Sequence, residues 1–186
     1  MTQEKSPEKF KLERDTNSSF NAYKYFFNRF SDYRQNNDSN ASVYIGSAEN
    51  LLKEQINQLT KIITLLPSGE KKQTEKKLEE VSPDELEKII YFTAHHLYCL
   101  ALKSYFESDI ESLKYNLKVG SLHFKAINEV KNADFLEQQL SDLESGKPFR
   151  IPILINDEYK ISKIDHPEDN SHQINKNNQT KDPSIV

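Results

Sequence analysis

The sequence predicts an all-α protein, an antiparallel bundle of five to six helices that occupies residues 18–146. Apolar residues recur at intervals of three and four through most of this range, the spacing that places them on one face of a helix. Capping residues, proline or glycine separate each apolar run from the next. The segment Ile89–Leu102 contains no charged residue although 29% of the chain is charged, and we therefore place it at the centre of the bundle.

The first predicted helix follows residues 1–17, which we expect to be flexible because they have almost no apolar content. Ser18 or Ser19 can cap this helix. An aromatic stripe then lies along one helix face and consists of Phe20, Tyr23, Phe27 and Phe30. Such stripes are usually buried, so we interpret it as a face that docks on the core. The alternative is a surface that binds a ligand or a partner.

A second helix is predicted to begin near Ser47 and to end at Pro67. Its apolar residues follow at four, three, four and three, as in a helix that packs along another one: Leu52, Ile56, Leu59, Ile63 and Leu66. Proline cannot continue the helical hydrogen-bond ladder. Residues 70–81 mix both signs of charge, and we expect a short solvated helix there.

The central helix has the clearest start signal. Ser82 can act as the N-cap, Pro83 suits the first helical position, and Glu85 can bond back to the cap residue. The helix is apolar on two sides, which carry Leu86, Ile90, Ala94, Leu97 and Ala101 on one and Tyr91, Cys99, Leu102 and Phe106 on the other. Such a helix needs neighbours on both sides, and a side left uncovered would be a partner-binding surface.

Two further helices complete the predicted bundle. Ser108–Glu111 repeats the capping signal, so the next helix begins almost without a loop and forms a tight antiparallel αα-hairpin with the central helix. Gly120 lies on its apolar seam, where a glycine indicates close approach of another backbone. The last helix keeps the same spacing from Ala133 to Leu143 and stops at Gly146.

Residues 147–164 are predicted to form a small β-hairpin. The alternating apolar residues are Ile151, Ile153 and Ile155 before an Asn156-Asp157 turn, and Tyr159 and Ile161 after it. Because Pro152 cannot donate to a ladder, we expect an edge element that lies on the bundle or pairs with a partner. Residues 165–186 are rich in Asn, Asp and Lys, and we expect them to be disordered.

The segment Leu97–Ile127 resembles a tetratricopeptide hairpin. The residues that carry the resemblance are Tyr98, Ala101 and Tyr105 in the first helix, the Ser108-Asp109 turn, and Leu113, Tyr115 and Val119 in the second helix. The resemblance implies peptide binding by a concave helical face.

Composition limits the function classes. The net charge of −4 disfavours nucleic-acid binding, which usually needs a basic surface. The single cysteine, Cys99, leaves no intrachain disulfide and fits a reducing compartment. The first residues are polar, and no uncharged run is long enough to cross a bilayer. We therefore expect a cytoplasmic protein without a membrane span.

His95, His96 and Cys99 are the strongest candidates for chemistry. His95 and Cys99 are four residues apart, hence on one helix face, and both can ligate zinc. No second pair of Cys or His has ligand spacing, and the same face is otherwise apolar, so we favour core packing over a metal site. A nucleophilic Cys99 would need an activating base in an accessible site. We expect no cofactor and no catalysis.

The sequence therefore favours a non-catalytic protein–protein interaction module, such as an adaptor, a chaperone-like binder or a regulatory subunit, that acts through a helical surface. Its partner would be another protein, and self-association into a homo-oligomer is compatible with this role. The candidate contact residues are Phe20, Tyr23, Phe27 and Phe30 in the aromatic stripe and Arg150, Ile151 and Ile153 in the hairpin.

Two alternatives stay open at this point. One is a small-ligand or metal-dependent enzyme that uses His95, His96 and Cys99 inside the bundle. The other is a secreted effector-type protein, exported through a non-classical signal in its C-terminal tail.

Overall fold

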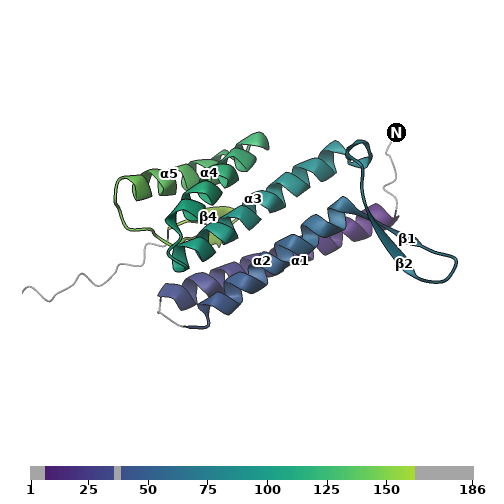
Figure 1. Cartoon of the computed structure of the whole chain (residues 1–186), viewed down its shortest axis with the longest axis horizontal. Coiled ribbons are helices and arrows are strands. Elements are labelled where there is room, and N and C mark those ends of the chain that lie inside the picture. Colours follow the sequence, from purple (N-terminus) through teal and green to yellow (C-terminus); the bar gives the residue numbers. More distant parts are fainter. Residues whose placement is uncertain (1–6, 36–38, 162–186) are drawn as a thin grey trace, which may run out of the picture.

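The computed structural model describes residues 7–35 and 39–161. These residues form five α-helices and two β-hairpins, which confirms the predicted helical bundle with a small C-terminal hairpin (Figure 1). The helices are α1 (Pro7–Gln35), α2 (Ala41–Thr60), α3 (Pro83–Phe106), α4 (Ile110–Ala126) and α5 (Val130–Glu144). The strands β1 (Lys61–Leu65) and β2 (Lys71–Glu75) pair with each other, as do β3 (Ile153–Ile155) and β4 (Glu158–Lys160).

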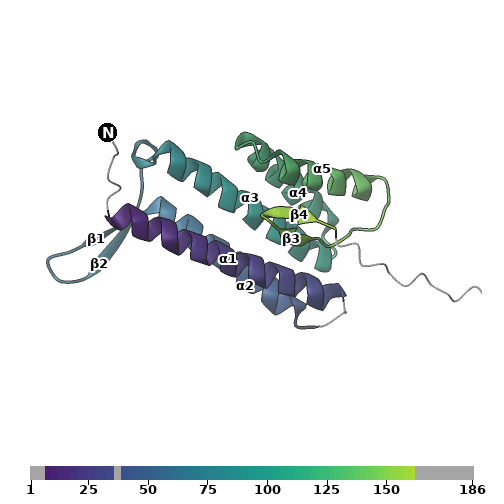
Figure 2. The same ribbon diagram turned by 180° about the vertical axis from the view of Figure 1, so that it is seen from behind.

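The helices pack in chain order. α2 lies along α1, α3 contacts both α2 and α4, and α5 packs on α4. The C-terminal hairpin, β3 and β4, lies between the first and the last helix, because β3 contacts α1 and β4 contacts α5 (Figure 2). The other hairpin, β1 and β2, extends outward from one end of the bundle, and we call it the projecting hairpin (Figure 1).

α3 begins as the sequence predicts. The Ser82 hydroxyl accepts a hydrogen bond from the Glu85 amide at 3.2 Å, and the Glu85 carboxylate accepts one from the Ser82 amide at 3.0 Å. The later turns of α3 are buried between α2 and α4, which explains why the helix is apolar on two sides. Leu86 is exposed, so this cover does not extend to the first turns.

The predicted αα-hairpin of α3 and α4 is also confirmed. Ser108 makes the tight turn with a φ of 59°, and the Asp109 carboxylate caps α4 by accepting from the Ser112 amide at 3.0 Å. Gly120 lies where the helices come closest. A Cβ atom there would be 2.9 Å from Cδ2 of Leu136 and 3.7 Å from the carbonyl oxygen of Ala94.

The first helix is longer than predicted. It begins at Pro7, so residues 7–17 are helical where their polarity predicts a flexible segment. Proline is favoured at the first helical position, and the Glu, Lys, Leu and Arg residues that follow are strong helix formers. Residues 1–6 and the predicted disordered tail at 165–186 lie outside the described residues.

The helix prediction is wrong for residues 61–81. α2 ends at Thr60, and the projecting hairpin replaces both the continuing helix and the short charged helix. β1 contains successive β-branched residues, which disfavour a helix and favour a strand. Gly69 makes the turn with a φ of 81°, and a short 3-10 turn at Leu78–Glu80 leads to α3.

The C-terminal hairpin turns at Asn156 and Asp157, both with positive φ, as the sequence predicts. The buried face of this hairpin is not the face that the alternating isoleucines predict. Leu154 and Tyr159 lie opposite each other across the strands and are buried, whereas Ile155 is exposed. Ile153 and Ile155 therefore mark the outer face of this hairpin, whereas Ile151 precedes β3 and packs against the core.

Two asparagines hold the C-terminal hairpin on the bundle. The Asn28 side chain of α1 donates to the Leu154 carbonyl at 2.9 Å and accepts from the Leu154 amide at 2.7 Å. The Asn132 side chain of α5 donates to the Asp157 carbonyl at 2.8 Å and accepts from the Tyr159 amide at 3.0 Å. Each amide side chain thus takes the place of a neighbouring strand.

Within the described part of the chain, none of the helices is both long enough and apolar enough to cross a bilayer.

Substitution of Gly120 tests the close packing of α4. Gly120→Leu is expected to lower the free energy of unfolding by about 2 kcal/mol, because overpacking a filled core costs about 1–3 kcal/mol. Gly120→Ala should change it by less than about 1 kcal/mol, since the end of the Leu136 side chain can move and alanine favours a helix. Urea denaturation followed by circular dichroism measures both. Equal effects of the two substitutions would contradict this packing.

Candidate functional site

A buried histidine lies at the centre of the core. His95 of α3 is 0% exposed. Aromatic rings from α1, α3, α4 and β4 surround it, and their centroids lie 4.5 to 5.4 Å from that of the imidazole: Phe20, Tyr23, Tyr91, Phe124 and Tyr159. The imidazole is therefore enclosed by the protein and separated from water.

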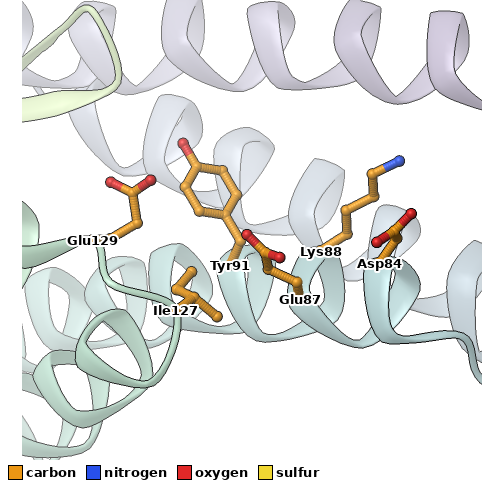
Figure 3. Close-up of a pocket in the computed structure, with 6 residues that line it drawn as sticks. All are labelled: Asp84, Glu87, Lys88, Tyr91, Ile127 and Glu129. Atoms are coloured by element: carbon orange, nitrogen blue, oxygen red, sulfur yellow. The ribbon is translucent and has the colours of Figure 1, made fainter.

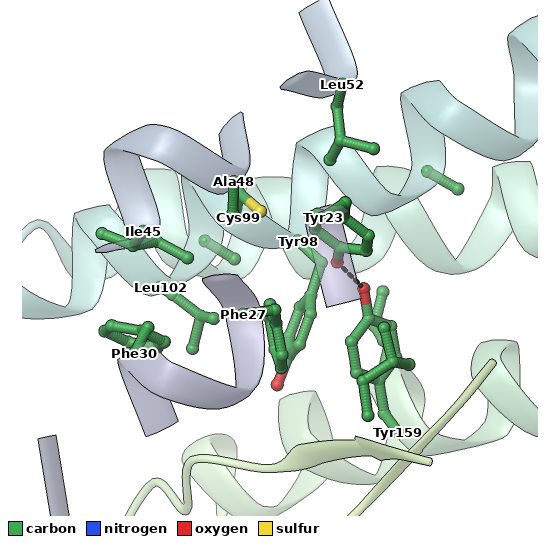
Figure 4. Close-up of a cluster of buried hydrophobic side chains, with 14 of the residues drawn as sticks. Tyr23, Phe27, Phe30, Ile45, Ala48, Leu52, Tyr98, Cys99, Leu102 and Tyr159 are labelled. Carbon is green, nitrogen blue, oxygen red and sulfur yellow. Dashed lines mark hydrogen bonds between the residues drawn. The ribbon is translucent and has the colours of Figure 1, made fainter. Parts of the chain in front are cut away.

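A short chain of hydrogen bonds links this histidine to two tyrosines. Nδ1 of His95 lies 2.5 Å from the Tyr159 hydroxyl. The Tyr159 hydroxyl lies 2.7 Å from the Tyr23 hydroxyl (Figure 4). Nε2 of His95 has no hydrogen-bond partner in the described part of the chain. The chain joins α1, α3 and the C-terminal hairpin through polar atoms that would be costly to bury singly.

The core keeps each of these groups uncharged. Burial, and then the positive charge of Lys24, lowers the pKa of His95 to about 3. Burial raises the pKa of the Tyr23 and Tyr159 hydroxyls well above the usual tyrosine value. Burial likewise raises the pKa of the Cys99 thiol. At neutral pH all four groups are in their neutral forms, as a low-dielectric interior favours.

The surroundings of Cys99 and His96 in the fold disfavour the metal-binding and nucleophilic roles considered from the sequence. Cys99 is fully buried and protonated, and a thiol in that state is a poor nucleophile and metal ligand. His96 lies apart from His95 and bonds to the Glu49 carboxylate at 3.4 Å. Among the described residues, no three His, Cys, Asp or Glu side chains gather closely enough to hold a metal ion.

Glu49 is a buried carboxylate on α2 that ties this helix to α3. Its oxygens lie 2.6 Å from Nζ of Lys53 and 2.6 Å from Nζ of Lys103. Burial by itself would raise the pKa of Glu49, but the hydrogen bonds from Lys103 and Lys53 outweigh it and bring the pKa to about 2. The carboxylate is therefore charged at neutral pH and acts as an interhelical brace.

A pocket of about 340 Å³ opens beside the first turns of α3 (Figure 3). Its lining comes from α3 and from the connection between α4 and α5, and consists of Asp84, Glu87, Lys88, Tyr91, Ile127 and Glu129. Burial raises the pKa of Glu129, and the negative charges of Asp157, Glu158 and Glu87 raise it further. We call this the acidic pocket. Its carboxylates and its apolar wall suit a cationic group on an apolar stem.

The projecting hairpin is the most exposed part of the described chain. Ile63 is 59% exposed and Leu65 is 70% exposed, and every residue of β2 is exposed as well. Neither face of this hairpin is covered by a helix. Its apolar side chains are therefore available to another molecule.

The hydrogen-bond pattern defines the free edge of β1. The Lys76 amide donates to the Thr60 carbonyl at 2.8 Å, and the Leu66 amide donates to the Glu70 carbonyl at 2.9 Å. Bonded pairs alternate with non-bonded pairs in an antiparallel ladder, so odd-numbered residues of β1 direct their amide and carbonyl groups outward. Ile63 and Leu65 thus combine exposed apolar side chains with unpaired edge groups.

The residues predicted to contact a partner lie in two different environments. Tyr23, Phe27 and Phe30 are fully buried, and Phe20 packs against them, which agrees with the interpretation of the stripe as a docking face for the core. Arg150 is exposed, Ile151 is half-buried and packs against the core, and Ile153 is half-buried on the outer face of the C-terminal hairpin. A role of these residues in partner binding stays a prediction.

Sequence reasoning missed Tyr159 as a core residue and Glu49 as an interhelical brace. No local pattern identifies either role, because the partners of Tyr159 are 64 and 136 residues away in the chain and those of Glu49 include Lys103, 54 residues away. The projecting hairpin had a local signal in its β-branched residues, which the apolar spacing of Ile63 and Leu66 concealed.

Comparisons of the chain with protein-family models, with curated proteins and with solved structures found no match.

Tyr159→Phe tests the hydrogen-bonded chain in the core. The substitution is expected to lower the free energy of unfolding by about 1–3 kcal/mol, because it removes the hydroxyl that His95 and Tyr23 share and leaves these two groups only their long mutual contact of 3.4 Å. Tyr115 is 65% exposed, and Tyr115→Phe is the control, expected to change the value by less than about 0.5 kcal/mol. Urea denaturation measures both, and equal stability of the two variants would contradict the assigned role.

Acid should destabilise the fold through His95. Its folded pKa is about 3 and its ordinary value is 6.5, so the unfolded chain binds more protons between these values. The stability contributed by the neutral imidazole is full above pH 6.5 and is lost as the pH falls towards 3. The free energy of unfolding should therefore decrease by roughly 1 kcal/mol per pH unit in this range.

Denaturant titrations between about pH 5 and the unfolded value of 6.5 measure that slope. Glu49, with a pKa of about 2 in the fold, stays ionised across this window and adds little to it. His95→Gln should remove most of the pH dependence that His95 contributes to the free energy of unfolding. An unchanged slope in this variant would show that the imidazole does not titrate as its burial requires.

Proposed function

We propose that this chain is a non-catalytic protein-interaction module that binds its partner through the projecting hairpin. The observation that carries the proposal is the exposure of Ile63 and Leu65 on a hairpin that no helix covers. A two-stranded hairpin is marginally stable in water, and an additional strand or a packing surface stabilises it. A partner would supply that missing support.

The free edge of β1 supports a specific mode of binding. Extended segments of other proteins bind exposed sheet edges by adding a strand, with main-chain hydrogen bonds for affinity and side-chain contacts for specificity. Ile63 and Leu65 would provide both on one stretch of chain. This mode differs from the helical surface that the sequence predicts, since the aromatic stripe is buried and α3 is covered over most of its length.

The interior also supports a non-catalytic role. An enzyme that used His95 and Cys99 would need solvent to reach them, and both side chains are fully buried in aromatic surroundings. The proposal of an exported effector depends on residues 165–186, which lie outside the described residues.

Site-specific photo-crosslinking tests the proposed function. A photo-reactive residue in place of Ile63 is expected to give a discrete adduct of higher mass in cells that produce the protein, because this side chain lies at the proposed contact. Mass spectrometry of the adduct then identifies the bound chain.

The matched control is the same photo-reactive residue in place of Leu122 on α4. Leu122 is 55% exposed and Ile63 is 59% exposed, so the two probes are exposed to solvent to a similar degree. The control should give no discrete adduct. Similar adducts from both positions, or none from position 63, would count against the projecting hairpin as the contact surface.

A further inference from the structure

Positive charge gathers on the projecting hairpin. Residues 61–77 contain five lysines and two glutamates, a local charge of +3 in a chain whose net charge is −4. Lys76 pairs with Glu85 at the base of the hairpin, at 3.0 Å. Lys71, Lys72 and Lys77 are exposed, and none of them forms an ion pair in the part of the chain that the structure describes. Their ammonium groups are free to contact another molecule.

Negative charge gathers at the acidic pocket. Asp84, Glu87 and Glu129 line it, and these three carboxylates likewise have no ion-pair partner among the described residues. In Figure 3, Glu87 and Tyr91 extend from α3, and Glu129 lies on the neighbouring connection. The negative charges of Asp157 and Glu158 act on Glu129 from the C-terminal hairpin. The three carboxylates of the lining outnumber Lys88, the cation in the same lining, so the site has a local excess of negative charge.

One face of the projecting hairpin carries groups that complement the carboxylates and the apolar wall of the acidic pocket. Leu65 lies opposite Lys71 and Ile63 lies opposite Gln73 in the ladder, so Leu65, Ile63 and Lys71 share a face. A lysine consists of an ammonium on an apolar stem, and the stem can lie along Tyr91 and Ile127 while the ammonium meets the carboxylates. The apolar groups of the hairpin face would thus meet the apolar wall of the pocket, and its ammonium group would meet the carboxylates.

The far end of the projecting hairpin points away from the bundle, and thus away from the acidic pocket of the same molecule (Figure 1). The hairpin extends outward from the end of the bundle (Figure 1), and the Lys76–Glu85 pair fixes its base beside the first turn of α3. The occupant of the pocket would therefore be the hairpin of another molecule. A second copy of the same chain would bring both the positive charge and the apolar side chains that suit the acidic pocket.

We propose that the projecting hairpin of one copy docks into the acidic pocket of a second copy, with its Lys71 and Leu65 face against Glu87, Glu129 and Tyr91. This inference rests on the proposed function in that the projecting hairpin is the contact surface, and it names the partner. In this contact the hairpin binds through the side chains of one face, and the free edge of β1 adds no strand, because helix α3 and a loop line the pocket. Hairpin and pocket are different surfaces, so the contact is heterologous: two copies can exchange hairpins reciprocally, or successive copies can form a longer assembly. Both forms require association that increases with protein concentration.

Sedimentation velocity on the purified full chain tests the proposal. We expect concentration-dependent association at about 0.05 M salt that weakens at about 0.5 M salt, because exposed charge pairs are screened. Lys71→Glu with Lys72→Glu should weaken self-association at least about tenfold, and so should Glu87→Lys with Glu129→Lys. Circular dichroism and thermal melting verify that each double variant is folded.

An equal mixture of the two double variants gives the decisive measurement. The variant with Glu87→Lys and Glu129→Lys keeps the basic hairpin, which can bind the unchanged acidic pocket of the variant with Lys71→Glu and Lys72→Glu. The reversed charges of the two variants, an acidic hairpin and a basic pocket, also attract each other. The mixture should therefore associate although neither variant does so alone. Reversal of Lys114 and Lys118 on α4 to glutamate is the matched control and should leave self-association unchanged.

A chain that is monomeric at every concentration would overturn the inference, and so would a mixture that fails to associate. Neither result would by itself overturn the proposed function, because the probe at position 63 would then capture a different protein. A probe at position 63 that captures nothing would overturn both.

Discussion

The fold depends on keeping a short row of polar side chains uncharged and hydrogen-bonded inside a shell of aromatic rings. Tyr23, His95 and Tyr159 come from chain positions 64 to 136 residues apart. Their bonds form only after α1, α3 and the C-terminal hairpin have packed together. Since a charge on any of the three would have to be buried without compensation, this cluster stabilises one arrangement of the three elements and disfavours others.

The two hairpins show how much a small sheet depends on its surroundings. The C-terminal hairpin has very short strands, yet Asn28 and Asn132 satisfy its outer backbone groups and Tyr159 anchors it in the core. The projecting hairpin has longer strands and lacks comparable support in the described part of the chain. Strand length therefore does not determine which hairpin belongs to the bundle; burial and side-chain hydrogen bonds do.

The helical part of this arrangement follows from local signals in the sequence. The Ser82 cap, the Asp109 cap and the Gly120 contact involve residues close in sequence or an interval that a helix repeats, so they were predictable. The projecting hairpin was not, because Ile63 and Leu66 continue a helical spacing by coincidence while their neighbours favour a strand. The acidic pocket brings together residues of α3 and of the connection between α4 and α5, and no spacing rule relates them.

The distribution of unpaired charge indicates where function lies. The interior uses its titratable groups for stability: two lysines neutralise Glu49, and tyrosines enclose His95. Outside, exposed charges contribute little to the stability of the fold, so stability does not account for their separation by sign. Lysines gather on the projecting hairpin and carboxylates around the acidic pocket. Such a separation does affect association, because unlike surfaces attract and two hairpins repel each other. The same charges would therefore direct a hairpin towards a pocket and oppose the edge-to-edge pairing of hairpins that their free edges would otherwise permit.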